Sequence, residues 1–136
     1  MATTLRPGWF VRTVANPVVA RLGMATTLVV QGRSSGVERS VPVNVLEHAG
    51  RRYLVSPRGE SDWVKNLRAS GEGELRRRRQ SERFRATEVD AAERPEVIAA
   101  YREKWDSQVR RFFEELADAA DHPTFLIEAA EEGAVR

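Results

Sequence analysis

The chain is organised around one stretch, Gly32-Arg33-Ser34-Ser35-Gly36-Val37-Glu38-Arg39-Ser40-Val41-Pro42-Val43. An apolar run at residues 27–31 precedes it and an alternating run begins at Val41, so the stretch is predicted to connect two strands. Its glycines allow positive φ and the close approach of a ligand, while its serine hydroxyls and guanidinium groups are able to bind an anion. The residues therefore indicate either a phosphate cradle or a solvated hairpin turn, and composition leaves both open.

The bulk composition limits the class of protein. A chain of 136 residues is expected to form one domain, over residues 1–136, around a single core. It has no cysteine, which excludes disulfides, zinc thiolate sites and cysteine nucleophiles and suits a reducing compartment. No apolar stretch approaches the roughly 18 residues of a transmembrane helix, and no secretory signal is recognisable. A cytoplasmic protein without an integral membrane segment is expected.

Charge is unevenly distributed, although the formal net charge is only +2. Residues 1–85 contain 16 Lys and Arg against 7 Asp and Glu, whereas residues 86–136 contain 6 against 13. An anion-binding surface is therefore expected in the first part of the chain. Residues 74–80 hold four consecutive arginines, which alternate between the faces of a strand and have no aromatic neighbours for base stacking. This run is interpreted as a solvated edge hairpin, and nucleic-acid binding is not expected.

Short strands dominate the expected secondary structure. They are predicted at residues 26–31, 39–47, 51–56, 74–80, 82–89 and 124–128. Because short hairpins join most of them, the pattern favours a small antiparallel barrel of about six strands. The fold class is therefore α+β, mainly β, with flanking helices.

Three helical segments are expected around this barrel. Residues 1–22 form an N-terminal helical segment that Pro17 interrupts, and its Trp9 and Phe10 beside arginines leave peripheral membrane contact open. Residues 61–71 form a short helix, which Ser61 or Asp62 begins and Gly71 ends. Residues 93–120 form a helical insertion of two packed helices before the last strand.

The sequence indicates no catalytic site made from the protein's own side chains. Only two histidines are present, His48 in a hairpin and His122 before a proline, so no metal site and no Ser-His-Asp arrangement is indicated. Carboxylates are scattered without a paired spacing that would favour acid and base catalysis. The sequence thus favours an enzyme whose reactive atom belongs to a bound cofactor.

Three motifs in order carry a family resemblance. They are residues 27–43 (TLVVQGRSSGVERSVPV), residues 50–59 (GRRYLVSPRG) and residues 63–69 (WVKNLRA). Together they resemble the deazaflavin-dependent nitroreductase family of small actinobacterial split β-barrel proteins, which are related to flavin-binding, pyridoxamine-oxidase-like folds. The resemblance implies a split antiparallel barrel here.

The resemblance also implies a binding site for the deazaflavin coenzyme F420. In the family, a glycine-flanked turn and a following arginine hold the phosphate and acidic tail, the ring lies along the next strand, and a loop and helix close the ring pocket. Carried over to this sequence, the tail site consists of Gly32, Arg33, Ser34, Ser35, Gly36 and Arg39, the ring strand of Val41, Pro42 and Asn44, and the closing elements of Pro57, Arg58, Gly59, Trp63, Asn66 and Leu67.

The implied function is that of an oxidoreductase, passing hydride from reduced F420 to an activated alkene, imine, quinone or nitro compound. In this family the substrate is contacted by the N-terminal segment and the later helices, which here makes Trp9, Phe10, Tyr101 and Trp105 the candidates. Tyr101 is either a proton donor or a packed core residue, and Trp63 is either a wall of the cleft or a core anchor.

Other functions remain open at this level. The same barrel would suit a carrier without catalytic activity, or a protein that binds FMN or haem instead. A homodimer is also expected to be compatible with the fold, because related split barrels often build the cofactor cleft between subunits.

Overall fold

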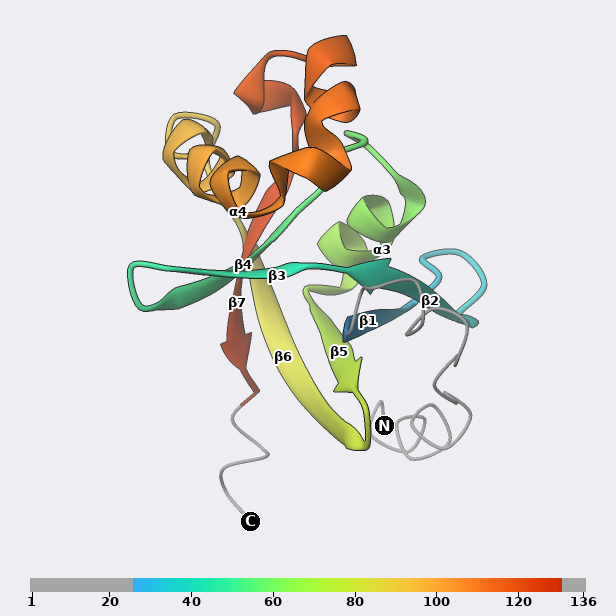
Figure 1. The fold of residues 1–136 in the computed structure, drawn as a ribbon. Helices are drawn as coiled ribbons and strands as arrows, with labels where there is room; N and C mark the ends of the chain where they lie inside the picture. Colours follow the sequence, from blue (N-terminus) through green and yellow to red (C-terminus); the bar gives the residue numbers. More distant parts are fainter. Residues whose placement is uncertain (1–25, 131–136) are drawn as a thin grey trace.

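The structure is a computed structural model that describes residues 26–130 (Figure 1). The predicted N-terminal helical segment, residues 1–22, lies outside the described residues. A curled antiparallel sheet of seven strands, in the order β2-β1-β5-β6-β7-β4-β3, dominates the fold. Its strands are β1 (Thr26–Gln31), β2 (Glu38–Val43), β3 (Val45–His48), β4 (Arg51–Val55), β5 (Glu72–Arg77), β6 (Gln80–Glu88) and β7 (Thr124–Ala129). The prediction of a split antiparallel barrel with flanking helices is confirmed.

The two edge strands of the sheet are consecutive pieces of the chain. β2 pairs with β1, with Val43 opposite Thr26, whereas β3 pairs with β4, with Val45 opposite Leu54. Asn44 lies between them and belongs to neither strand. The prediction of one strand over residues 39–47 is therefore wrong: the chain bends at Asn44, because its two halves hydrogen-bond to opposite ends of the curled sheet. The sheet consequently has seven strands rather than six.

The main core lies inside the curl of the sheet. Leu28, Leu54 and Phe84 are completely buried there, and Phe125 is nearly so. Gly73 faces Phe84, and a Cβ atom at this glycine would lie 2.9 Å from the ring. The glycine is therefore required so that β5 can pass close to this aromatic side chain.

Helix α3 (Asp62–Ser70) covers one end of this core. Ser61 is its N-cap residue, and Gly71 ends it in the left-handed region at φ 75°, where its N–H donates to the Leu67 carbonyl oxygen (2.7 Å). Both boundaries match the sequence prediction. Val64 and Leu67 are completely buried, which anchors the helix against the sheet.

Helix α4 (Arg94–Glu115) packs on the outside of the curl over a second core. Its backbone leaves helical geometry at Trp105 (φ −125°, ψ 24°), so the two predicted helices are the halves of one broken helix. Tyr101 and Phe113, one from each half, pack into a cluster with Tyr53 of β4. A short 3-10 helix, η1 (Ala119–Asp121), then leads into β7.

The arginine-rich hairpin lies inside the sheet rather than at its edge. β5 lies between β1 and β6, and β6 lies between β5 and β7. The predicted edge position is therefore wrong, because β1 and β7 pair with this hairpin from far away in the sequence. Arg76 and Arg77 pair with β6, so only the two arginines at the tip of the hairpin lie outside the strands. The side chain of Arg76 also donates to the fully buried Glu74 (Nε to Oε2, 3.0 Å).

None of the helices within residues 26–130 is long and apolar enough to cross a membrane.

Leu54 tests the main core. Replacing Leu54 with Ala removes a fully buried side chain, and we expect the free energy of unfolding to fall by about 2–5 kcal/mol in urea denaturation. Val37→Ala is the matched control, because Val37 is 46% exposed and its loss creates no cavity. Equal effects of the two substitutions would contradict the assignment of the core.

Candidate binding cleft

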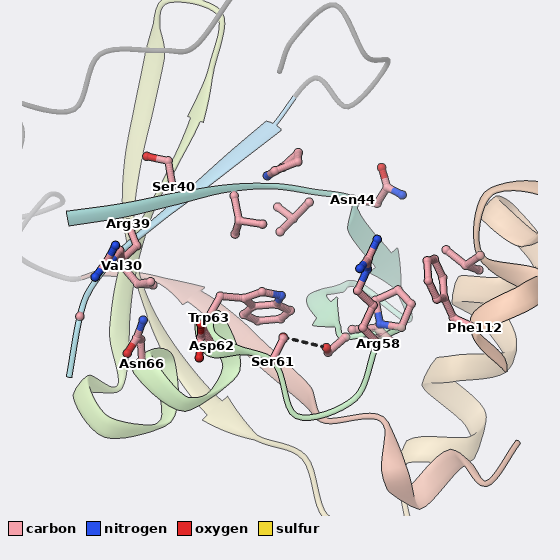
Figure 2. Close-up of a pocket in the computed structure, with 18 of the residues that line it drawn as sticks. Val30, Arg39, Ser40, Asn44, Arg58, Ser61, Asp62, Trp63, Asn66 and Phe112 are labelled. Carbon is pink, nitrogen blue, oxygen red and sulfur yellow. Dashed lines mark hydrogen bonds between the residues drawn. The ribbon is translucent and has the colours of Figure 1, made fainter. Parts of the chain in front are cut away.

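A single cleft collects most of the residues that the sequence singled out (Figure 2). Its volume is about 820 Å³, within the range of small-molecule sites. Four parts of the chain line it: the turn and strand of residues 30–44, the loop of residues 55–58, the first turn of α3, and the half of α4 that follows Tyr101. Figure 2 shows Arg39 and Asn66 at one end, Trp63 in the middle, and Arg58 with Phe112 at the other end.

The turn after β1 is tightly hydrogen-bonded. The N–H of Gly36 donates to the Gly32 carbonyl oxygen (2.9 Å), and the N–H of Gly32 donates to the Val37 carbonyl oxygen (2.8 Å). Gly36 has φ 74°, and a Cβ atom at Gly32 would lie 2.9 Å from Ser35 Oγ. Both glycines therefore serve the turn itself, which presents Ser34 and Ser35 at the rim of the cleft.

Arg33 joins this turn to α3. Its backbone N–H and its Nη1 both donate to Oδ1 of Asn66, at 2.9 and 2.7 Å, and its Nη2 lies 3.8 Å from Asp62. Asn66 is 4% exposed and the Arg33 side chain is 40% exposed, so this contact is a partly buried structural tie. Arg33 therefore has a structural role in addition to its positive charge.

Arg39 is the second arginine at this end of the cleft. The side chain is exposed and lines the cleft, and it makes no ion pair with any residue of the 26–130 range. A guanidinium group without an internal partner is available to an anionic ligand. The positive charge of the turn is thus divided between one tied and one available arginine.

Trp63 forms the middle of the cleft. Its ring packs against Phe125 of the core, with centroids 6.1 Å apart, and its other side lies among the cleft residues (Figure 2). Val41 of β2 lines the same region and packs against the same core. Trp63 is therefore both a core residue and a wall of the cleft, so the two interpretations of the sequence hold together.

Polar groups converge at the end opposite the turn. Nδ2 of Asn44 donates to Oε1 of Gln108 (3.2 Å), and Tyr101 is 3% exposed beside them. Burial raises the pKa of Tyr101 to about 12, and a hydrogen bond with the Asn44 side chain opposes this rise. The guanidinium of Arg58 lies over the ring of Phe112, with Cζ 4.8 Å from the centroid. The hydroxyl of Tyr101 therefore stays protonated at neutral pH.

The structure brings most of the sequence-selected residues together. The cleft is lined by Gly32, Arg33, Ser34, Ser35, Arg39, Val41, Pro42, Asn44, Pro57, Arg58, Trp63, Asn66 and Tyr101. Three others support it without lining it: Gly36 shapes the turn, Gly59 is buried against Leu116, and Leu67 is in the core. Trp105 lines a separate hollow, and its ring is tilted by 52° against that of Tyr101, with centroids 5.0 Å apart. Trp9 and Phe10 lie outside the described residues.

Sequence reasoning missed the contribution of α4 beyond Trp105. Gln108, Val109 and Phe112 line the cleft, whereas the sequence predicted only two packed helices over residues 93–120. Their spacing places them on the same face as Tyr101, which was a usable signal. Ser40 and Ser61 were also missed. Ser40 lies between the selected Arg39 and Val41, and Ser61 is the N-cap residue of the helix that carries Trp63.

Residues 26–130 contain no cluster of three or more His, Asp or Glu side chains that could hold a metal ion. The charged side chains that line the cleft are those of Arg33, Arg39, Arg58 and Asp62.

A family comparison adds independent information to this geometry. The sequence profile of the F420H(2)-dependent quinone reductase family matches residues 5–113, most of the chain. The chain belongs to this family. The resemblance to F420-dependent split-barrel reductases, drawn from the motifs, is thereby confirmed. No curated protein sequence matches the chain.

Solved structures agree with the fold of this F420-dependent family. An F420-H2-dependent reductase (FDR-A) is 20% identical, with a TM-score of 0.59, over 76% of this chain and 92% of its own. A structure described as a domain-swapped dimer is also 20% identical, with a TM-score of 0.55, over 76% and 78%. The haem storage protein HutZ from Vibrio cholerae is 14% identical, with a TM-score of 0.56, over 87% and 92%. At these identities the likeness establishes the split-barrel fold alone.

Tyr101 tests the environment at the polar end. In a Tyr53→Phe variant, Tyr101 is the remaining tyrosine, and its ultraviolet absorption should titrate near pH 12 instead of near 10. Because the folded-state pKa is raised, the stability from the neutral hydroxyl is complete below pH 10 and is lost as pH rises toward 12. A transition centred near pH 10 in the folded protein would contradict the burial of this hydroxyl.

Proposed function

We propose that this chain is a reductase that transfers hydride from reduced F420 to a quinone or a similar small organic acceptor. The observation that carries the proposal is the order of groups along one cleft: an arginine and serine turn, a partly buried tryptophan, and a polar end around a protonated tyrosine. Membership in the F420H(2)-dependent quinone reductase family supports the same coenzyme and acceptor class.

The residues at the turn fit the anionic part of F420. Arg39 is available for a charge-assisted hydrogen bond, and the hydroxyls of Ser34 and Ser35 lie beside it on the cleft rim. Arg33 adds positive charge while Asn66 holds it in place. We therefore assign the phosphate and acidic tail of the coenzyme to this end, as the motifs implied.

The middle of the cleft fits a planar ring system. Trp63 and Val41 supply apolar surface, and β2 is an edge strand whose outer backbone groups have no ladder partner within residues 26–130. Such an edge is able to hydrogen-bond the carbonyl and N–H groups of a ring while the tryptophan packs against its plane. Pro57 and Arg58 would close the site from the loop side.

The polar end is assigned to the acceptor. When bound, reduced F420 supplies a hydride, and a quinone that takes up this hydride and one proton becomes a hydroquinone. Tyr101 holds a proton at its hydroxyl and would donate a hydrogen bond to an acceptor oxygen, while Asn44 and Gln108 keep this end polar. The protein thus contributes alignment and exclusion of water.

Coenzyme binding tests the proposal directly. We expect the purified chain to quench the fluorescence of oxidised F420, and Arg39→Ala to weaken its affinity by about 1–3 kcal/mol through loss of a charge-assisted bond. Arg79→Ala is the matched control: it removes the same charge from the hairpin turn, outside the cleft, and should leave the affinity unchanged.

Two results would contradict the proposed function. One is the absence of F420 binding at micromolar concentrations, and the other is tight binding of FMN or haem in its place. With reduced F420 and a soluble naphthoquinone, coenzyme oxidation should depend on the quinone. A protein that binds F420 but never oxidises its reduced form with any acceptor would be a carrier.

A further inference from the structure

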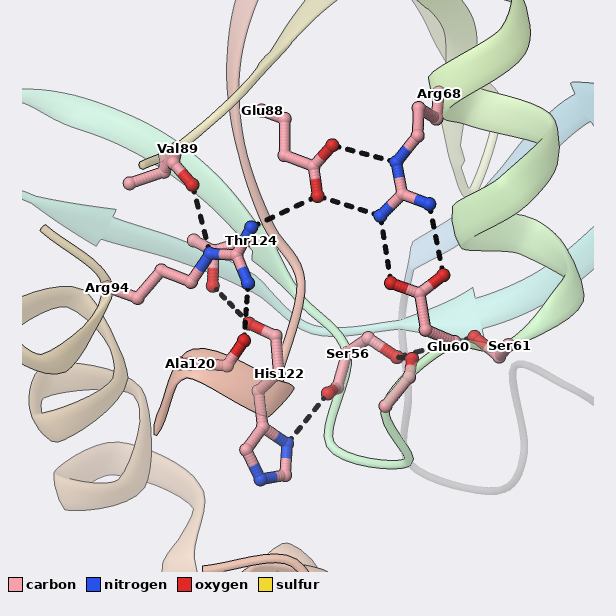
Figure 3. A network of polar contacts seen from close by, with 11 residues as sticks. Ser56, Glu60, Ser61, Arg68, Glu88, Val89, Arg94, Ala120, His122 and Thr124 are labelled. Carbon is pink, nitrogen blue, oxygen red and sulfur yellow. Dashed lines mark hydrogen bonds and ion pairs between the residues drawn. The ribbon is translucent and has the colours of Figure 1, made fainter. Parts of the chain in front are cut away.

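His122 is a completely buried histidine behind the cleft loop, between η1 and β7. Its Nδ1 lies 3.0 Å from the carbonyl oxygen of Ser56, where the loop leaves β4, as Figure 3 shows. Its Nε2 lies 2.6 Å from the carbonyl oxygen of Leu116, at the end of α4. The ring thus connects two segments that are distant in the sequence.

Each of these two contacts requires a proton on the ring nitrogen that makes it. A backbone carbonyl oxygen is only an acceptor, and a neutral imidazole has one N–H donor and one lone pair. In the neutral ring, one nitrogen lone pair would face a carbonyl oxygen at hydrogen-bond distance, without solvent to separate them. The ring satisfies Ser56 and Leu116 together only when both nitrogens carry protons. Stacking on Phe113, with centroids 4.1 Å apart, fixes its plane.

We propose that His122 is a positioning residue, protonated on both ring nitrogens, that clamps the loop of residues 56–61 to the end of α4. This loop carries Arg58, whose guanidinium lies over Phe112 of α4 in the cleft. The clamp holds both partners of that contact at a set separation. Its effect on F420 binding rests on the proposed function, whereas the protonation and the clamp do not.

The loop itself is built to transmit this constraint. The hydroxyl of Ser56 donates to the Gly59 carbonyl oxygen (2.6 Å), and the N–H of Ser61 donates to the same oxygen (2.9 Å). A Cβ atom at Gly59 would lie 3.0 Å from Leu116 Cδ2, so the loop lies directly against the end of α4. Fixing Ser56 therefore fixes the residues up to the start of α3.

A second tie to the loop is much more exposed. Arg68 of α3 bonds Glu60 with both terminal nitrogens (3.0 and 2.9 Å) and also bonds Glu88 of β6 (Figure 3). The Arg68 and Glu60 side chains are 40% and 52% exposed, so water and salt weaken this pair. The buried bonds of His122 are therefore expected to dominate the position of the loop.

The protonation is tested by nitrogen NMR on the folded protein. His48→Gln leaves His122 as the single histidine of the chain, so the imidazole signals belong to one ring. We expect both ring nitrogens to carry slowly exchanging protons at pH 7. A single protonated nitrogen, the pattern of a neutral tautomer, would overturn the proposal.

The clamp is tested with two variants. His122→Phe keeps a stacking ring but no donor, and it should speed hydrogen exchange at the Gly59 and Ser61 amides and weaken F420 binding about tenfold. His122→Asn supplies an amide donor near the place of Nδ1, so it should recover part of both properties. His48→Gln, at a half-buried histidine that bonds to Glu96 away from the loop, should change neither.

Unchanged exchange and unchanged affinity in His122→Phe would overturn the clamp. Failure of the unmutated chain to bind F420 would instead reject the proposed function alone, because exchange and ring protonation are measured without the coenzyme. If His122→Phe fails to fold, the ring protonation and the exchange in His122→Asn still decide the proposal.

Discussion

The fold depends on the way one continuous run of chain supplies both edges of the sheet. Residues 38–48 pair first with β1 and then with β4, and the change of partner occurs at Asn44. The sheet is therefore curled by covalent connection as well as by twist. The same run lines the cleft from Arg39 to Asn44, so the constraint that shapes the core also shapes the candidate site.

Side chains from distant segments then hold the cleft in shape. Asn66 ties the turn after β1 to α3 through Arg33, and His122 connects the loop after β4 to the end of α4. Asn66 and His122 are themselves buried, so water competes for these partly buried ties less than it would at the surface. Binding of a ligand to the Arg39 guanidinium and to this turn should therefore cost little further conformational entropy.

Local features were the ones that sequence reasoning predicted well. The glycine turn, α3 with its Gly71 ending, and β1 follow from residues within a few positions of one another. The motif order also indicated the split barrel and most of the cleft lining. By contrast, the break at Asn44 and the interior position of β5 and β6 depend on which distant strands pair with them. The alternation of apolar and polar residues and the positions of charges predict a strand, but they do not predict which strands pair with it.

The sequence by itself determined the turn chemistry, the ends of α3, the lack of cysteine ligands and the family to which the chain belongs. Tertiary structure alone decided that Arg33 is tied while Arg39 is available, that α4 contributes a wall of the cleft, and that His122 meets two carbonyl oxygens. The physical reason is that hydrogen-bond partners and burial are set by neighbours in space. Asn66 lies 33 residues from Arg33 and Ser56 lies 66 residues from His122, so these contacts become defined only once the sheet has curled.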